Sequence, residues 1–136
     1  MIGATTHEGG CLCGQVRWRA IAAPANVRIC HCRLCQLATG GPFFARAIFL
    51  AADFSWTGET TAWNSSPRLV RRSCARCGTP LFAEPNDPPA RTGVSIVTAD
   101  DRRALTPEVH IWVSEKAAWL RLEDGLPQYA EGFPAI

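Results

Sequence analysis

Seven cysteines in three short clusters constrain the fold of this chain more than any other feature of its sequence. The clusters are C-L-C at residues 11–13, C-H-C-R-L-C at residues 30–35 and C-A-R-C at residues 74–77. Because an odd number of cysteines cannot form a closed disulfide framework, the clusters are more typical of metal ligands or reactive thiols. Four ligands complete a structural zinc site, and three leave a position open for water or substrate. The division of the seven thiols between such sites then decides what the chain can do.

The chain has 136 residues and a net charge of +2, which fit a single domain over residues 1–136. Its basic residues are scattered, whereas a dedicated nucleic-acid binder more often has a strong basic excess, so we expect no nucleic acid as partner. The first ten residues, MIGATTHEGG, lack the features of a secretory signal, and no stretch approaches the roughly 18 apolar residues of a membrane span. We therefore expect a cytoplasmic protein without a membrane partner, whose thiols are reduced.

Short segments with the patterns of β-strands alternate with turn signals, and no segment shows a long helical period of apolar residues. Val16, Trp18 and Ala20 alternate with polar residues, which is typical of a half-buried strand over residues 14–20. A helical turn or two after Cys35 is predicted to stop at Gly40. We predict a mainly β architecture with a core over about residues 9–120 and an irregular C-terminal tail over residues 121–136. The other predicted strands cover residues 42–50, 60–64, 68–72, 80–84, 93–99 and 109–114.

Cys74 and Cys77 form a C-x-x-C motif followed by Gly78, a spacing that lets a tight turn direct both sulfurs at one metal ion. Cys11 and Cys13 form a C-x-C motif, and on an extended chain residues i and i+2 point to the same side. The two pairs together supply four thiolates, the complement of a closed structural zinc site. The alternatives are a redox role for the C-x-x-C motif and burial of Cys11 and Cys13 as small apolar residues.

The three remaining thiols can converge on a second metal ion if an extended run is followed by a two-residue turn. They are Cys30, Cys32 and Cys35. His31 lies between two of them and is expected to point the opposite way, which makes it a poor fourth ligand. Three protein ligands are the usual complement of a catalytic zinc site. The alternatives are a second structural site completed by a distant residue such as His7 or His110, a labile thiol cluster without metal, and an exchange of cysteines between the two sites.

Three thiolates bring a charge of −3 to a divalent ion, so the bound ion suits soft ligands and is a weaker Lewis acid than one held by three neutral histidines. A substrate thiol is the natural occupant of the open position, because coordination lowers the pKa of a thiol so that it binds as the thiolate. The predicted chemistry is therefore the making or breaking of a bond at a substrate sulfur. Hydrolysis by zinc-bound hydroxide is less favoured.

The sequence resembles the glutathione-dependent formaldehyde-activating enzyme family, whose domain also occurs in centromere protein V. The resemblance covers about residues 9–120, and four segments carry it in the family's order: GGCLCGQVRWRA, CHCRLCQLATGGPFF, SCARCGTPLF and HIWVSEKAAWL. It implies a β-tent fold, in which short antiparallel sheets assemble around zinc. It also implies two zinc ions per chain. The structural zinc would be held by Cys11, Cys13, Cys74 and Cys77, and the catalytic zinc by Cys30, Cys32 and Cys35.

The resemblance implies a zinc-dependent enzyme of the carbon–sulfur lyase type, which condenses a thiol such as glutathione with formaldehyde or a related small aldehyde. The thiol sulfur would be activated at the open zinc position and attack the aldehyde carbon. The alternatives are a non-catalytic zinc-binding module for macromolecular interaction and a thiol or zinc sensor. Metal content and turnover separate these functions, and the sequence does not predict an oligomeric state.

Charged side chains near the predicted catalytic site are candidates for substrate binding, because glutathione carries two carboxylates. Arg33, Arg46 and Arg76 could each pair a carboxylate, and the alternative is that they are solvated surface charges. Gln36 stands where the family often has a basic residue after the third cysteine, and residues 39–41 form either a ligand-binding turn or a plain one.

Histidines and aromatic residues complete the candidates near this site. His31 is a candidate proton shuttle, and the alternative is a packed, hydrogen-bonded histidine. His110 is a candidate hydrogen-bond partner of a zinc-bound sulfur. Phe43, Trp112 and Trp119 are expected to fill the core or line a pocket rather than perform chemistry.

Overall fold

The computed structural model describes residues 6–133, so residues 134–136 of the predicted tail lie outside the described residues. The described chain is mainly β, as predicted. Its strands are β1 (His7–Gly10), β2 (Arg17–Ala20), β3 (Asn26–Cys30), β4 (Phe44–Leu50), β5 (Phe54–Thr57), β6 (Thr60–Ser66), β7 (Leu69–Cys74), β8 (Pro80–Pro85), β9 (Arg91–Ser95) and β10 (Val109–Ile111). The α-helix is α1 (Arg33–Thr39), and the 3-10 turns are η1 (Ala51–Asp53), η2 (Ile96–Thr98) and η3 (Val113–Glu115).

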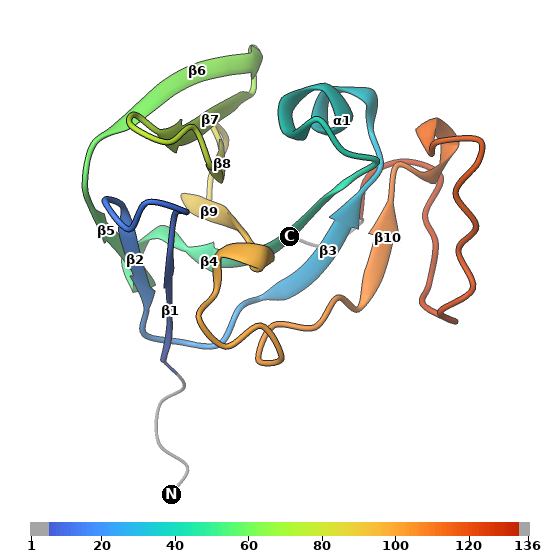
Figure 1. Ribbon diagram of the computed structural model, residues 1–136. Helices are drawn as coiled ribbons and strands as arrows, with labels where there is room; N and C mark the ends of the chain where they lie inside the picture. The colour runs from blue at the N-terminus through green and yellow to red at the C-terminus, as the bar shows by residue number, and fades with distance from the viewer. Residues whose placement is uncertain (1–5, 134–136) are drawn as a thin grey trace, which may run out of the picture.

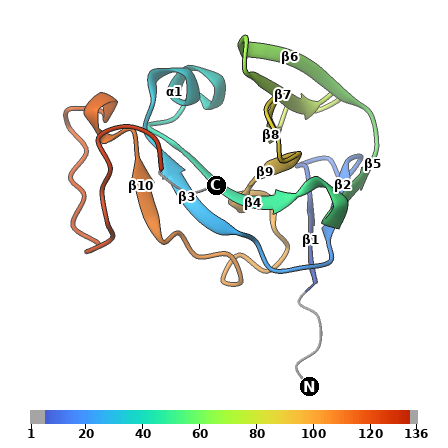
Figure 2. The same ribbon diagram turned by 180° about the vertical axis from the view of Figure 1, so that it is seen from behind.

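The strands form two sheets (Figure 1). β1, β2 and β5 make a small sheet, and the larger sheet has the order β10-β3-β4-β9-β8-β7-β6. All pairs are antiparallel except β10 with β3, which run parallel. The larger sheet curves, so that β6 and β7 at one edge lie at the same end of the molecule as α1, at the top of both views (Figures 1 and 2). This curvature creates a concave side on which α1 faces β7.

The predicted strands are present, but several are shorter than expected. The prediction for residues 93–99 is wrong after Ser95, because residues 96–98 turn into η2. The prediction for residues 109–114 is wrong after Ile111, because Trp112 has a φ of 57°, outside the range of a β-strand. Helix α1 stops at Gly40 as predicted, with a φ of 72°, but it begins at Arg33, before the third cysteine of its cluster.

Each face of the larger sheet carries a hydrophobic core, and cysteines belong to both cores. Phe44 and Phe49 of β4 point to opposite faces, because successive side chains of a strand alternate. Phe49 packs in the core that contains Trp18, Cys11 and Cys74, with Cys77 packed against it. Phe44 packs with Ile111 and the cysteines of the second cluster. The predicted alternation of apolar and polar residues over residues 14–20 is confirmed. Val16, Trp18 and Ala20 are all buried in the core that contains Phe49.

The C-terminal segment, residues 121–133, is irregular and lies along β10. The Tyr129 backbone N–H donates to the His110 carbonyl, and the Trp112 N–H donates to the Glu131 carbonyl, both at 2.9 Å. Tyr129 and Phe133 pack against the core that holds the second cysteine cluster. None of the helices over residues 6–133 has the length and apolar character needed to cross a bilayer. The division into a core over residues 9–120 and a tail stays a prediction.

Candidate metal centres

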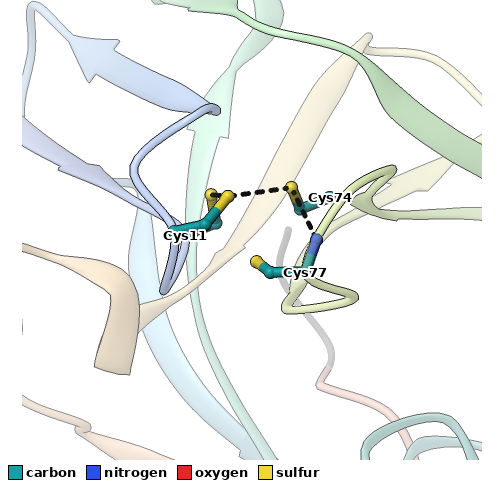
Figure 3. A group of neighbouring side chains, drawn as sticks. Cys11, Cys74 and Cys77 are labelled. Carbon is teal, nitrogen blue, oxygen red and sulfur yellow. Dashed lines mark hydrogen bonds between the residues drawn. The ribbon is translucent and has the colours of Figure 1, made fainter.

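The cysteines of the first and third clusters lie close together in the folded chain (Figure 3). Cys11 and Cys13 lie in the loop between β1 and β2, whereas Cys74 ends β7 and Cys77 lies in the turn between β7 and β8. The Sγ atoms of Cys11 and Cys13 are 3.6 Å apart, and those of Cys13 and Cys74 are 3.8 Å apart. The expected extended geometry of the C-x-C motif is wrong. A turn, closed by the Gly14 N–H on the Cys11 carbonyl at 3.1 Å, brings its sulfurs together instead.

Backbone N–H groups point at these sulfurs from both loops. The Val16 N–H donates to Cys11 Sγ at 3.3 Å, and the Arg76 and Cys77 N–H groups donate to Cys74 Sγ at 3.3 and 3.4 Å. The Cys77 Sγ lies 3.1 Å from the Thr79 hydroxyl, and this hydrogen bond lowers the pKa of Cys77 to about 5. Such donors favour thiolates, which are the form that binds metal.

This arrangement fits a zinc ion. Zinc–sulfur bonds of about 2.3 Å in a tetrahedron separate neighbouring sulfurs by about 3.8 Å. The observed separations of 3.6 and 3.8 Å match that value, and all four ligand atoms lie within 4.8 Å of one another. The four cysteines can therefore surround a metal ion completely. Their assignment as ligands of a structural zinc stays a prediction.

The second cluster forms a separate group of three sulfurs, all within 4.8 Å of one another. Cys30 ends β3, Cys32 is the N-cap of α1, and Cys35 lies in the first turn of that helix. The Cys35 backbone N–H donates to Cys32 Sγ at 3.4 Å. Within residues 6–133, no fourth histidine, cysteine or carboxylate joins this group, so neither His7 nor His110 completes it. The structure thus brings the seven cysteines together as the predicted four and three.

The three thiols of the second cluster differ in acidity. Hydrogen bonds from Cys30 and Cys32 and the charges of Arg46 and Arg71 lower the pKa of Cys35. Hydrogen bonds to Cys32 and Cys35, together with burial, raise the pKa of Cys30. Cys35 is thus the sulfur on which negative charge is best stabilised. The donor set of three closely spaced thiols fits a soft divalent ion such as zinc.

Two arginines stand beside Cys35. Arg71 places Nη2 at 3.3 Å from Cys35 Sγ, and Arg46 places Nη1 at 4.0 Å from the same atom. The expectation that Arg46 lies near the site is therefore confirmed. Arg33 has an exposed side chain, and Arg76 lies beside the four-cysteine group instead. The sequence did not predict Arg71 at this site, because only the pairing of β7 with its neighbours shows which side of the sheet each residue faces.

A buried chain of hydrogen bonds runs behind the three cysteines. His31 Nε2 lies 2.8 Å from His110 Nδ1, and His110 Nε2 lies 2.7 Å from Asp124 Oδ2. The expected bond between His110 and a cysteine sulfur is therefore wrong. Burial and the neighbouring His110 lower the pKa of His31 to about 4, which keeps its ring neutral near pH 7. His31 is packed edge-on to Phe43, with ring centroids 5.6 Å apart, and its role as a proton shuttle stays a prediction.

Gln36 and the aromatic candidates have structural contacts. Gln36 Nε2 donates to the carbonyls of His31 and Glu115 at 2.8 and 2.9 Å, which ties α1 to the segment after β10. Trp112 packs against the core of the second cluster, as expected. Trp119 does not, because its side chain is 72% exposed.

A shallow cavity of about 220 Å³ lies beside the three-cysteine group. Phe44, which packs with Cys30 and Cys35, lines it, and so does Thr39, whose hydroxyl donates to the Cys35 carbonyl at 2.8 Å. Pro80 and Val97 form the apolar opposite side. Two further cavities, of about 300 and 320 Å³, lie along β1, and none of the three cavities is lined by a cysteine. Because Phe44 and Thr39 contact the residues of the three-cysteine group, the cavity at Phe44 is a candidate place for a small substrate.

The chain is similar to known proteins both in sequence and in fold. A family model described as "Glutathione-dependent formaldehyde-activating enzyme" matches residues 6–115. An "Uncharacterized lyase" of Schizosaccharomyces pombe is 30% identical over 76 residues, and the alignment spans 56% of each protein. A "Putative glutathione-dependent formaldehyde-activating enzyme" of Halomonas elongata is 26% identical over 128 residues, which cover 85% of this chain and 80% of that one. A crystal structure of a Rhodobacter sphaeroides protein shares the fold, with a TM-score of 0.56 and 18% identity over 90% of this chain and 98% of that one.

Proposed function

Because this chain belongs to the glutathione-dependent formaldehyde-activating enzyme family, we propose that it is a zinc-dependent enzyme of the carbon–sulfur lyase type. It condenses a thiol such as glutathione with formaldehyde or a related small aldehyde. The thiol loses its proton, its sulfur forms a bond to the aldehyde carbon, and the carbonyl oxygen takes up a proton to become a hydroxyl. The names of the relatives support a lyase of this kind.

The observation that carries the proposal is the difference between the two cysteine groups. Cys11, Cys13, Cys74 and Cys77 can enclose a structural zinc, whereas Cys30, Cys32 and Cys35 leave one position of a tetrahedron without a protein ligand. A zinc ion held by the three cysteines would supply Lewis acidity and so lower the pKa of an incoming thiol. A substrate ligand can take the position that the protein leaves open.

The residues around the three cysteines offset charge and line the adjacent cavity. Arg71 and Arg46 offset the negative charge that collects on the sulfurs, and Phe44 and Thr39 border the cavity in which a small aldehyde can meet the thiol sulfur. Arg46 is also the best-placed of the predicted cations for a substrate carboxylate, because its guanidinium lies on the same face of the sheet. A cytoplasmic location stays a prediction.

Metal analysis and turnover test the proposal together. The purified protein should contain two zinc ions per chain, and it should form the adduct from glutathione and formaldehyde faster than the spontaneous reaction. One zinc per chain and no acceleration would instead favour a non-catalytic zinc module.

Two matched substitutions separate the roles of the cysteine groups. Cys32→Ser should abolish the acceleration and remove one zinc while the domain stays folded. Cys77→Ser should instead unfold the domain, because a structural zinc contributes directly to the free energy of folding. Circular dichroism and zinc content report both outcomes, and identical behaviour of the two variants would refute the division into four and three.

A further inference from the structure

Arg71 is a buried cation whose partner is a cysteine sulfur. Its side chain lies in β7 with 5% of the residue exposed, and its Nη2 donates to Cys35 Sγ at 3.3 Å. Within residues 6–133, no carboxylate forms an ion pair with it. Removing a guanidinium from water without an anionic partner is costly. The Cys35 thiolate is the anion that the fold offers to Arg71.

The fold holds this guanidinium in place from two further sides. Its Nε donates to the Ser65 hydroxyl at 2.8 Å, and its Cζ atom lies 5.9 Å from the centre of the Phe44 ring. Ser65 is the extra residue of a β-bulge, because Asn64 pairs with Val70 and Ser66 pairs with Leu69. A bulge redirects a side chain, and this one brings the hydroxyl to the arginine.

Small residues leave room for Arg71 on this face of the sheet. Its partner on β8 is Ala83, whose own partner on β9 is Gly93. A Cβ atom on Gly93 would lie 2.8 Å from Cδ of Arg46, so the glycine lets that second arginine cross β9 as well. Arg72 faces the opposite side, where it pairs with Glu84 at 2.7 Å and lies over Trp56. The neighbouring arginines of β7 therefore have unrelated surroundings.

The contact between Arg71 and Cys35 makes the three sulfurs unequal as metal donors. Three thiolates and a divalent ion leave a net charge of −1 in a partly buried site, which Arg71 can offset. An N–H···S hydrogen bond withdraws electron density from the sulfur that accepts it. Cys35 receives this bond, and Nη1 of the second arginine, Arg46, lies 4.0 Å from the same sulfur. We infer that Arg71 is a positioning residue that weakens Cys35 as a metal donor and thereby sets the acidity of a thiol bound at the three-cysteine group. The second half of this inference rests on the proposed function.

Cobalt spectroscopy of the full chain tests the inference without turnover. Cobalt can replace zinc in tetrahedral thiolate sites, and its sulfur-to-metal charge-transfer band moves to longer wavelength as the sulfur donates more strongly. Arg71→Gln should therefore shift the band to longer wavelength, and Arg71→Lys, which retains a charged donor, should restore much of the original position. Arg72→Gln is the matched control, and its spectrum should superimpose on that of the parent protein.

Ser65→Ala provides a second route if Arg71→Gln does not fold. It retains the arginine but removes the acceptor of Nε, so a shift smaller than that expected for the glutamine variant should appear in the same direction. A parental spectrum for Arg71→Gln, or for Ser65→Ala where the glutamine variant cannot be purified, overturns the inference. Equal shifts for the glutamine and lysine variants also overturn it, because they would indicate a loss of packing rather than of the N–H···S bond.

Turnover distinguishes failure of this inference from failure of the proposed function. If the parent protein accelerates adduct formation, Arg71→Gln should lower kcat about 10-fold or more, as is typical for partners of metal ligands, and Arg71→Lys should recover part of that loss. If the parent protein shows no acceleration but the cobalt band of Arg71→Gln still shifts, the proposed function is refuted, whereas the effect of Arg71 on Cys35 is supported. An active parent with unchanged kcat and unchanged spectrum in Arg71→Gln would refute the inference alone.

Discussion

The hydrogen-bond chain His31–His110–Asp124 connects the C-terminal segment to the junction between β3 and α1, and His110→Phe breaks it. Phenylalanine retains an aromatic ring in the position of His110, which is buried in β10. It removes both ring nitrogens, and with them the bonds of 2.8 Å to His31 and 2.7 Å to Asp124. His31 is fully buried, and its Nδ1 has no hydrogen-bond partner among residues 6–133. The variant therefore leaves the His31 ring without a side-chain partner.

The expected loss of stability is about 1–4 kcal/mol. Leaving a buried polar group unsatisfied costs about 1–3 kcal/mol, and this applies to His31 Nε2. Asp124 is 43% exposed, so water replaces most of what it loses and this bond adds at most about 1 kcal/mol. Small domains are stable by about 5–15 kcal/mol, so the sum would be a large share of the total.

Urea denaturation followed by tryptophan fluorescence measures this loss, and the concentration of free zinc must be the same for every variant because bound metal adds to stability. Asp124→Asn is the matched control. Its amide oxygen can still accept from His110, so it should cost less than about 1 kcal/mol. The double variant His31→Phe with His110→Phe should be more stable than the sum of the single variants predicts, because it removes both buried partners at once. A loss below about 0.5 kcal/mol for His110→Phe, or simple additivity in the double variant, would refute the reasoning.

Three further outcomes are expected. Gly58→Ala should lower the melting temperature much more than Gly14→Ala, because a Cβ at Gly58 would lie 2.2 Å from the Gln15 carbonyl oxygen while one at Gly14 meets no atom within 4 Å; equal effects would contradict this. Prolonged chelation should lower the melting temperature strongly, since structural zinc contributes folding energy, and a chelator-insensitive melting curve would speak against a structural metal. The hydrogen bond from Arg17 lowers the pKa of Asp100 from its ordinary value of 3.8. The Asp100 carboxylate therefore contributes fully to the free energy of unfolding above pH 3.8, and this contribution is lost as the pH falls through the lowered pKa. Asp100→Asn should therefore flatten the loss of stability toward acid pH, measured as urea midpoints, and an unchanged slope would show that this carboxylate contributes nothing.

The strands and the cysteine groups could be predicted from the sequence because both depend on short-range patterns. Alternation of apolar and polar residues over residues 14–20 is enough to predict which side chains of that strand are buried, and these are the ones found in the core. Spacings of one and two residues likewise limit which sulfurs can reach a common ion. The turn at Trp112 could not be predicted, because a left-handed backbone at a tryptophan reflects its tertiary contacts rather than its own preference.

The surroundings of the three cysteines depend on strand register instead. Arg71 and Arg72 are adjacent in the sequence, and a shift of one residue in the pairing of β7 with β8 would exchange their faces. His31 and His110 are separated by 79 positions and meet only because β10 pairs in parallel with β3. Neither contact leaves a periodic pattern that a sequence could reveal.

The sequence by itself therefore determined the family through the order of its four motifs, and it predicted the mainly β class and the grouping of seven thiols into four and three from local patterns and spacings. The tertiary structure decided which charges and hydrogen bonds surround the open group of three. It did so through the curvature of the larger sheet, the bulge at Ser65 and the path of the C-terminal segment along β10. These are long-range arrangements, and the residues that they bring together acquire their roles only when the chain is folded.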